Sequence, residues 1–197
     1  MQNVLPIQQR PYNAYGEYMV DLRSGVMAAG LAGDSEIYQF RWSAATACLV
    51  TEVRLWVASG GTSFAGSWAS FRLFAARAWT VDGTGGATST ITTNSHKLRT
   101  GMPTTAIGTA RIATTSVIGA GTKTLDAQAL SSAGCDTTAS LSLQLPAVYL
   151  IGGAPARSPV ILAQNEGLSL VATVPATGTW VFGVSVRYEE AQEFRQP

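Results

Sequence analysis

The segment TWVFGVSVRYEE, residues 179–190, has the clearest side-chain alternation in the sequence. Every second position holds a large apolar residue, namely Trp180, Phe182, Val184, Val186 and Tyr188. Because successive side chains of a β-strand point to opposite faces of the sheet, this pattern predicts a strand with one face against a hydrophobic core. The preceding Pro-Ala-Thr-Gly, residues 175–178, predicts a hairpin turn to the strand before it.

The same period of two recurs in other segments. It is present in residues 36–42 and 48–58, and the aromatic-rich residues 67–79 favour another strand. Turn signals such as Asp82-Gly83 separate these short apolar segments. About eight to ten short strands with hardly any helix predict an all-β fold, an antiparallel β-sandwich that is jelly-roll-like.

The N-terminus differs from the rest of the chain. Residues 1–20 have neither helical nor strand periodicity, and they predict an extended N-terminal arm. Aromatic residues are scarce in disordered segments, so we expect Tyr12, Tyr15 and Tyr18 to anchor the arm on its own domain or on a neighbouring protein. Residues 21–197 contain no linker and predict a single domain.

Two further segments predict local structure other than a strand. Residues 24–32 are compatible with one short helix, and the small residues 131–140 predict a loop that contains Cys135. Cys48 lies in an apolar strand segment and is expected to be a buried thiol. One pair of cysteines is not a disulfide framework, and the sequence leaves open whether these two pair.

The composition is poor in charge. Charged residues make up 13% of the chain, and the net charge is +1. Ordinary soluble domains have about 25% charged residues. This balance favours neither nucleic acid nor an anionic membrane surface as a partner. A surface of small neutral residues is typical of a protein buried in an assembly, although a monomer with a Thr-rich solvent face is the alternative.

Two sequence features concern the location of the protein. The N-terminus has no basic region followed by an apolar segment, and no stretch of about 18 apolar residues occurs. We therefore expect no signal peptide and no membrane-spanning helix. The protein is expected to be made and kept in the cytoplasm, or exported by lysis.

The sequence has few residues that carry catalytic chemistry. His96 is the single histidine, so any Ser-His-Asp or Cys-His system would have to include it. One histidine and two separated cysteines do not have the spacing of a zinc site. No two carboxylates stand out as a glycosidase pair. We expect a protein that is not an enzyme and has no metal or cofactor.

The five tryptophans suggest different environments. Trp42 and Trp180 fit the core of a sandwich. Trp56 alternates onto the same strand face as Glu52 and Arg54, which makes it a candidate for a protein contact or a ligand surface. An exposed tryptophan, either Trp56 or Trp68, would favour a carbohydrate-binding sandwich.

Several segments resemble structural proteins of tailed bacteriophages and prophages. The resemblance rests on FRLFAARAWTVDGTGG (71–86), NSHKLRTGMPTT (94–105), TKTLDAQAL (122–130), PVILAQNEG (159–167) and VPATGTWVFGVSV (174–186). These segments lie within residues 71–186, a region of over half of the chain, and they carry no catalytic signature.

The resemblance implies a virion structural protein. Its favoured role is capsid cement or decoration, as a homotrimer seated on the lattice of the major capsid protein and made in the host bacterial cytoplasm. A neck, tail or fibre component is the first alternative. A carbohydrate-binding sandwich that helps host attachment is the second.

Overall fold

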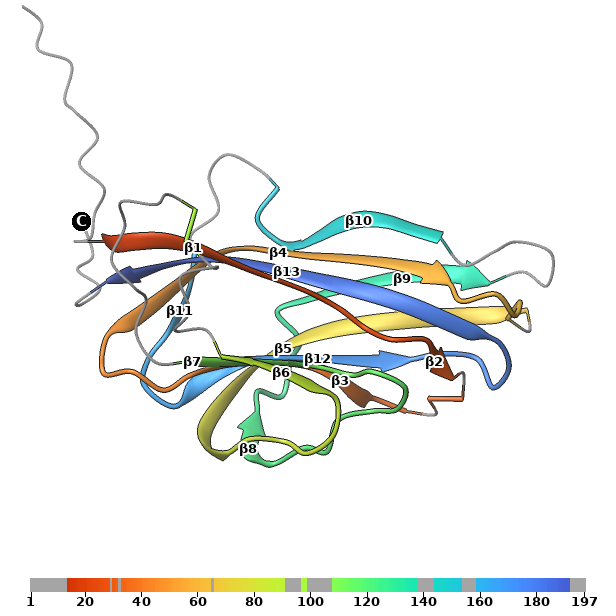
Figure 1. The fold of residues 1–197 in the computed structure, drawn as a ribbon, viewed down its shortest axis with the longest axis horizontal. Helices are drawn as coiled ribbons and strands as arrows, with labels where there is room; N and C mark the ends of the chain where they lie inside the picture. Colours follow the sequence, from red (N-terminus) through yellow and green to blue (C-terminus); the bar gives the residue numbers. More distant parts are fainter. Residues whose placement is uncertain are drawn as a thin grey trace, which may run out of the picture.

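The computed structural model describes residues 14–28, 30–31, 33–64, 66–90, 97–98, 108–137, 144–153 and 159–191. Every regular element in these ranges is a β-strand, and two antiparallel sheets pack face to face (Figure 1), so the predicted β-sandwich is confirmed. The first sheet contains β1 (Ala14–Arg23), β2 (Met27–Ala28), β4 (Ala47–Ser59), β10 (Gln144–Ile151), β11 (Val160–Leu162) and β13 (Thr179–Ala191). The second contains β3 (Ser35–Trp42), β5 (Ser67–Val81), β6 (Ala87–Thr90), β7 (Gly108–Ile112), β8 (Thr122–Leu125), β9 (Ser131–Thr137) and β12 (Glu166–Thr173).

The strand order is that of a jelly roll. From the two ends of the chain inward, β1 pairs with β13, β3 with β12, β4 with β10 and β5 with β9. The pairs β13–β4 and β12–β5 join these into the orders β1-β13-β4-β10 and β3-β12-β5-β9. The chain is thus one long folded hairpin wound into two sheets, as in double-sheet jelly rolls.

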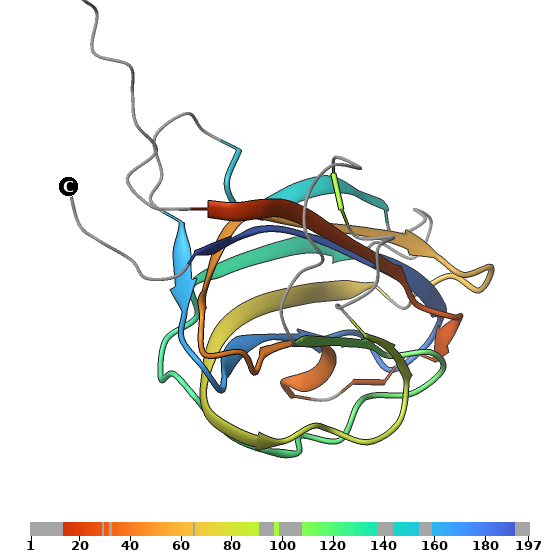
Figure 2. The same ribbon diagram turned by 60° about the vertical axis from the view of Figure 1, so that its left-hand side comes forward.

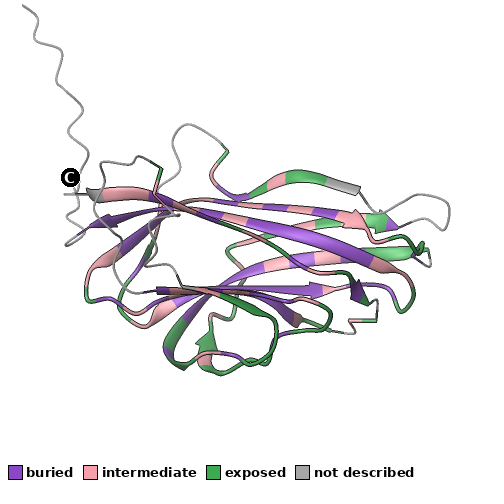
Figure 3. Cartoon of the chain, in the orientation of Figure 1, coloured by how far each residue is buried: buried purple, intermediate pink, exposed green. Residues whose placement is uncertain are grey.

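The core lies between the sheets and follows the predicted alternation. All five large side chains of β13 from Trp180 to Tyr188 are fully buried. The Tyr188 ring lies 5.3 Å from Tyr18, 5.4 Å from Phe40 and 6.0 Å from Trp42, centroid to centroid. Figure 3 shows the buried colour along β13 and β12 and exposed residues on β8 and β10.

The predicted boundary of the N-terminal arm at residue 20 is wrong. Residues 14–20 belong to β1, which pairs with β13 along its length. Tyr18 and Val20 are fully buried because they face the second sheet. Residues 1–13, with Tyr12, lie outside the described residues.

Three local predictions are also corrected. Within residues 24–32, Met27 and Ala28 form β2 on the edge of β13 instead of a helix. Residues 131–137 form β9 instead of a loop, because each of them pairs with β5. The turn at residues 175–178 does not close a hairpin, since β12 and β13 lie in different sheets. Both cysteines are free thiols, Cys48 in the first sheet and Cys135 in the second.

A long insertion joins the middle strands β5 and β9. It adds the hairpin β6–β7 to the edge of β3 and β8 to the edge of β5. Figure 2 shows the described residues 82–90 and 108–130 of this insertion beside and beneath the second sheet, whereas Lys97 forms a bridge with Tyr18 of β1. The outer face of the second sheet is therefore partly covered by the chain itself.

Replacing Phe182 tests the shared core of the two sheets. Phe182 is fully buried and stacks on Trp180 at 5.2 Å. We expect Phe182→Ala to lower the free energy of unfolding by about 3–5 kcal/mol, because the cavity adds to the lost burial. Urea unfolding measures the change. Val26→Ala, at a residue that is 52% exposed, is the control, and equal losses in the two variants would contradict this account.

Candidate functional site

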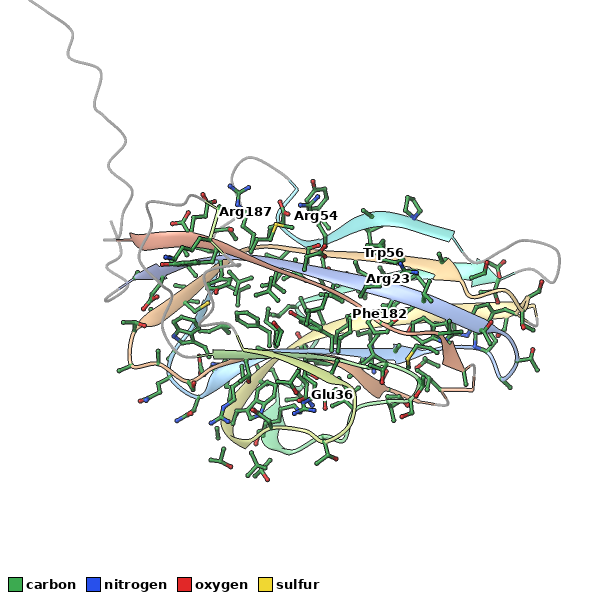
Figure 4. The ribbon with its side chains drawn as sticks, in the orientation of Figure 1. Arg23, Glu36, Arg54, Trp56, Phe182 and Arg187 are labelled. Carbon is green, nitrogen blue, oxygen red and sulfur yellow. The ribbon has the colours of Figure 1, made fainter. Side chains whose placement is uncertain are left out.

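The two outer faces of the sandwich differ in what covers them. Figure 4 shows Arg23, Arg54, Trp56 and Arg187 along the first sheet, Phe182 between the sheets and Glu36 on the insertion side of the second sheet. We call the outer surface of β1, β13, β4 and β10 the open face. The insertion covers part of the opposite face.

A buried ion pair holds the insertion against the second sheet. The Lys123 ammonium lies 2.8 Å from the Glu36 carboxylate, and these side chains are 3% and 8% exposed. Glu36 also accepts a hydrogen bond from the hydroxyl of Ser169, which is fully buried. The Lys123 nitrogen lies 4.5 Å from the centre of the Trp79 ring, so it is also placed for a cation–π contact.

The insertion approaches the sheet closely beside this pair. The Gln39 amide donates to the Gly119 carbonyl and accepts from the Gly83 N–H, each at 3.1 Å. A Cβ at Gly83 would overlap the Gly119 carbonyl oxygen, so the contact requires a glycine. These contacts make this part of the second sheet unavailable to a partner.

Trp56 is the central aromatic residue of the open face. Its indole lies directly on Gly183 of the neighbouring strand, where any Cβ would overlap the ring. The Arg23 guanidinium carbon lies 5.9 Å from the ring centre. Trp56 is half-buried, so one part of it contacts the protein and the rest faces solvent. Its role in a protein contact or a ligand surface stays a prediction.

The other arginines of the open face are also held in place. Arg54 lies 2.6 Å from the Glu52 carboxylate and 5.7 Å from the centre of the Tyr149 ring, which is 50% exposed. Arg187 donates to Glu17 on β1 at 2.6 Å. The open face is thus a surface of ordered aromatic and guanidinium planes. None of its four strands contains a lysine.

The predicted tyrosine anchors have separate outcomes. Tyr18 is fully buried in its own domain, which is one of the two alternatives that the sequence left open for it. Tyr15 lies in β1, but its side chain is outside the description, and Tyr12 lies outside it entirely.

A groove on the second sheet lies beyond the insertion. Its volume is about 500 Å³, and it is lined by Gly33, Asp34, Trp68, Ser70, Arg72, Ser132, Ala133, Gly134 and Thr173. Trp68 is 62% exposed, the highest value among the large apolar residues that the structure describes. The sequence identified Trp68 as a candidate. It did not single out Asp34 among the carboxylates and gave no signal for Gly134, which the fold brings together from distant segments.

The titratable groups of the described residues are mostly engaged in structural contacts. Asp126 and Glu166 both accept hydrogen bonds from Arg77, and the bond from Arg77 lowers the pKa of Asp126. Burial raises the pKa of both cysteine thiols, which disfavours the reactive thiolate. In the described ranges, no group of three His, Cys, Asp or Glu residues could hold a metal ion. His96 lies outside these ranges.

Comparisons with known proteins leave the family open. No family model matches the chain, and no curated protein is detectably similar to it. The described part of the chain contains no helix that is long and apolar enough to cross a membrane. The resemblance to phage structural proteins therefore stays a prediction.

Removing the buried lysine tests how the insertion is held. We expect Lys123→Met to lower the free energy of unfolding by about 3–5 kcal/mol, because it leaves the Glu36 carboxylate buried without its cation. The double variant Lys123→Met/Glu36→Gln should recover most of this loss, since no buried charge remains. Thermal and urea unfolding of both variants measure the effect.

Arg77 provides the matched control for this ion pair. It also binds two carboxylates, but its side chain is 54% exposed. Exposed ion pairs contribute about 0–1 kcal/mol. A loss in Arg77→Met as large as that in Lys123→Met would contradict the role of burial.

Proposed function

We propose that this chain is a non-catalytic structural protein of a tailed-phage virion, which decorates the capsid by binding its lattice through the open face. The observation that carries the proposal is the asymmetry of the sandwich. One outer face is partly covered by the insertion, whereas the other, among the residues that the structure describes, presents Trp56, Tyr149 and the ordered arginines as partly exposed side chains.

The residue types of the open face support a protein contact. Tyrosine, tryptophan and arginine are enriched at the centres of interfaces, and lysine is depleted there. The arginines are already held by Glu17 and Glu52, so little side-chain entropy is lost when a partner docks. These pairs also leave the face with little net charge. Binding should therefore depend weakly on salt.

The size of the open face favours a multi-copy assembly. Four strands spaced about 4.8 Å apart and roughly 30 Å long give about 600 Å². A stable one-to-one contact buries about 800 Å² on each partner. A further contact, such as those within a homotrimer, would supply the missing area. The low content of charged side chains, 13%, is consistent with additional surface buried between copies.

The copy number of the protein in purified virions tests the assigned position. Quantitative mass spectrometry against the major capsid protein is expected to give a number comparable with that of the lattice protein. A few copies per particle would instead favour a neck, tail or fibre component. Absence from the virion would contradict the structural role.

Replacing Trp56 tests the open face directly. We expect Trp56→Ala to weaken binding to particles that lack the protein by about 30-fold or more, the effect of losing about 2 kcal/mol at an interface hot spot. Sedimentation of particles with added protein measures the binding. Trp68→Ala, on the opposite side of the sandwich, is the matched control. Unchanged binding by Trp56→Ala would rule out the open face as the contact.

A further inference from the structure

We propose that the groove beside Trp68 binds a neutral saccharide. The site begins with the alternation of β5, where Trp68, Ser70 and Arg72 point away from the core while Ala69 and Phe71 point into it. These three side chains follow one another along the strand at intervals of about 7 Å. The inference rests on the groove and is independent of the proposed role in the virion.

The floor of the groove is made of small residues from three adjacent strands. Ser70 of β5 lies opposite Thr173 of β12 on one side and Gly134 of β9 on the other. Gly134 has no side chain to fill the space beside Ser70, and its backbone does not require glycine for conformational reasons. A low strip therefore runs across the sheet between the larger side chains of Trp68 and Arg72.

The two sides of the groove offer different chemistry. On one side is the exposed ring of Trp68. On the other, Arg72 donates to both carboxylate oxygens of Asp34, and its guanidinium carbon lies 5.2 Å from the centre of the Phe74 ring. The carboxylate and the ring fix the plane of the guanidinium. The Arg72 and Asp34 side chains are still 40% and 42% exposed, so they have polar atoms available to a ligand.

This combination fits a sugar ring. One face of a pyranose consists of C–H groups that pack on an indole, and its hydroxyls can each donate and accept hydrogen bonds. The Arg72–Asp34 pair offers donors and acceptors side by side, and the floor adds the hydroxyls of Ser70 and Thr173. Small-molecule sites commonly measure about 300–1,000 Å³, a range that includes this groove of about 500 Å³.

The charge of the groove selects the class of saccharide. Arg72 is its single cation, and that cation is already neutralised by Asp34. A carboxylated or sulfated sugar would bring a further negative charge beside the Asp34 carboxylate. A neutral saccharide brings no such charge, which is why we assign the neutral class.

The test uses the full chain and defined sugars. Binding of maltotriose, cellotriose, chitotriose, lactose and sialyllactose is measured by isothermal titration calorimetry, after a screen on a glycan array. We expect at least one neutral glycan to bind, and Trp68→Ala to weaken that binding at least tenfold. Trp56→Ala, which alters a tryptophan on the open face, should leave it unchanged.

A second variant tests the groove with the tryptophan in place. Gly134→Val would fill the floor, and its Cβ would lie 3.3 Å from the Ala69 carbonyl oxygen, a tight contact that a shift of a few tenths of an ångström relieves. We expect this variant to keep its melting temperature within a few degrees and to lose saccharide binding. The proposal is overturned if no neutral glycan binds, if sialyllactose is the sole ligand, or if both variants bind as the parent chain does. Loss of particle binding in Trp56→Ala alone would affect the proposed virion contact and not the groove.

Discussion

The pairing of the first strand with the last is the constraint on which the other features of this fold depend. β1 lies against β13 with Tyr18 directly opposite Tyr188, and the two rings stack at 5.3 Å. β13 in turn lies between β1 and β4, so its inward side chains meet the second sheet at the centre of the core. Because the partners of each strand are far away in the sequence, closing the outermost pair orders a loop that contains nearly the whole domain.

This winding also determines where additional chain can be accommodated. The middle strands β5 and β9 are neighbours in one sheet, so the connection between them can grow without separating the two sheets. The insertion uses this position and is held by the buried contact between Lys123 and Glu36. The two outer faces of the sandwich therefore differ. The outer surface of the first sheet presents Trp56, and the groove beside Trp68 lies on the part of the second sheet beyond the insertion.

The sequence predicted the burial of side chains better than it predicted the neighbours of strands. Alternation is local, and every apolar side chain from Trp180 to Tyr188 that it assigned to the core is buried. Strand partners are not local. The turn at residues 175–178 has the composition of a hairpin, yet the strands on its two sides enter different sheets. The sequence predicts an arm over residues 14–20 because Gly16 and the preceding prolines conceal the alternation that places Tyr18 and Val20 in the core.

The surroundings of Trp56 and Trp68 also depend on strand pairing, which the sequence does not predict. The two side chains differ in how firmly the neighbouring residues hold them. Trp56 could be assigned to an outer face from its own strand, but its seat on Gly183 depends on strand register. That seat holds the indole against the sheet, so less conformational freedom would be lost if a partner contacted it. Trp68 instead projects beside a floor of small residues, where a ligand must enter to make contact. The two tryptophans therefore favour different classes of partner, although both lie on outward positions of long strands.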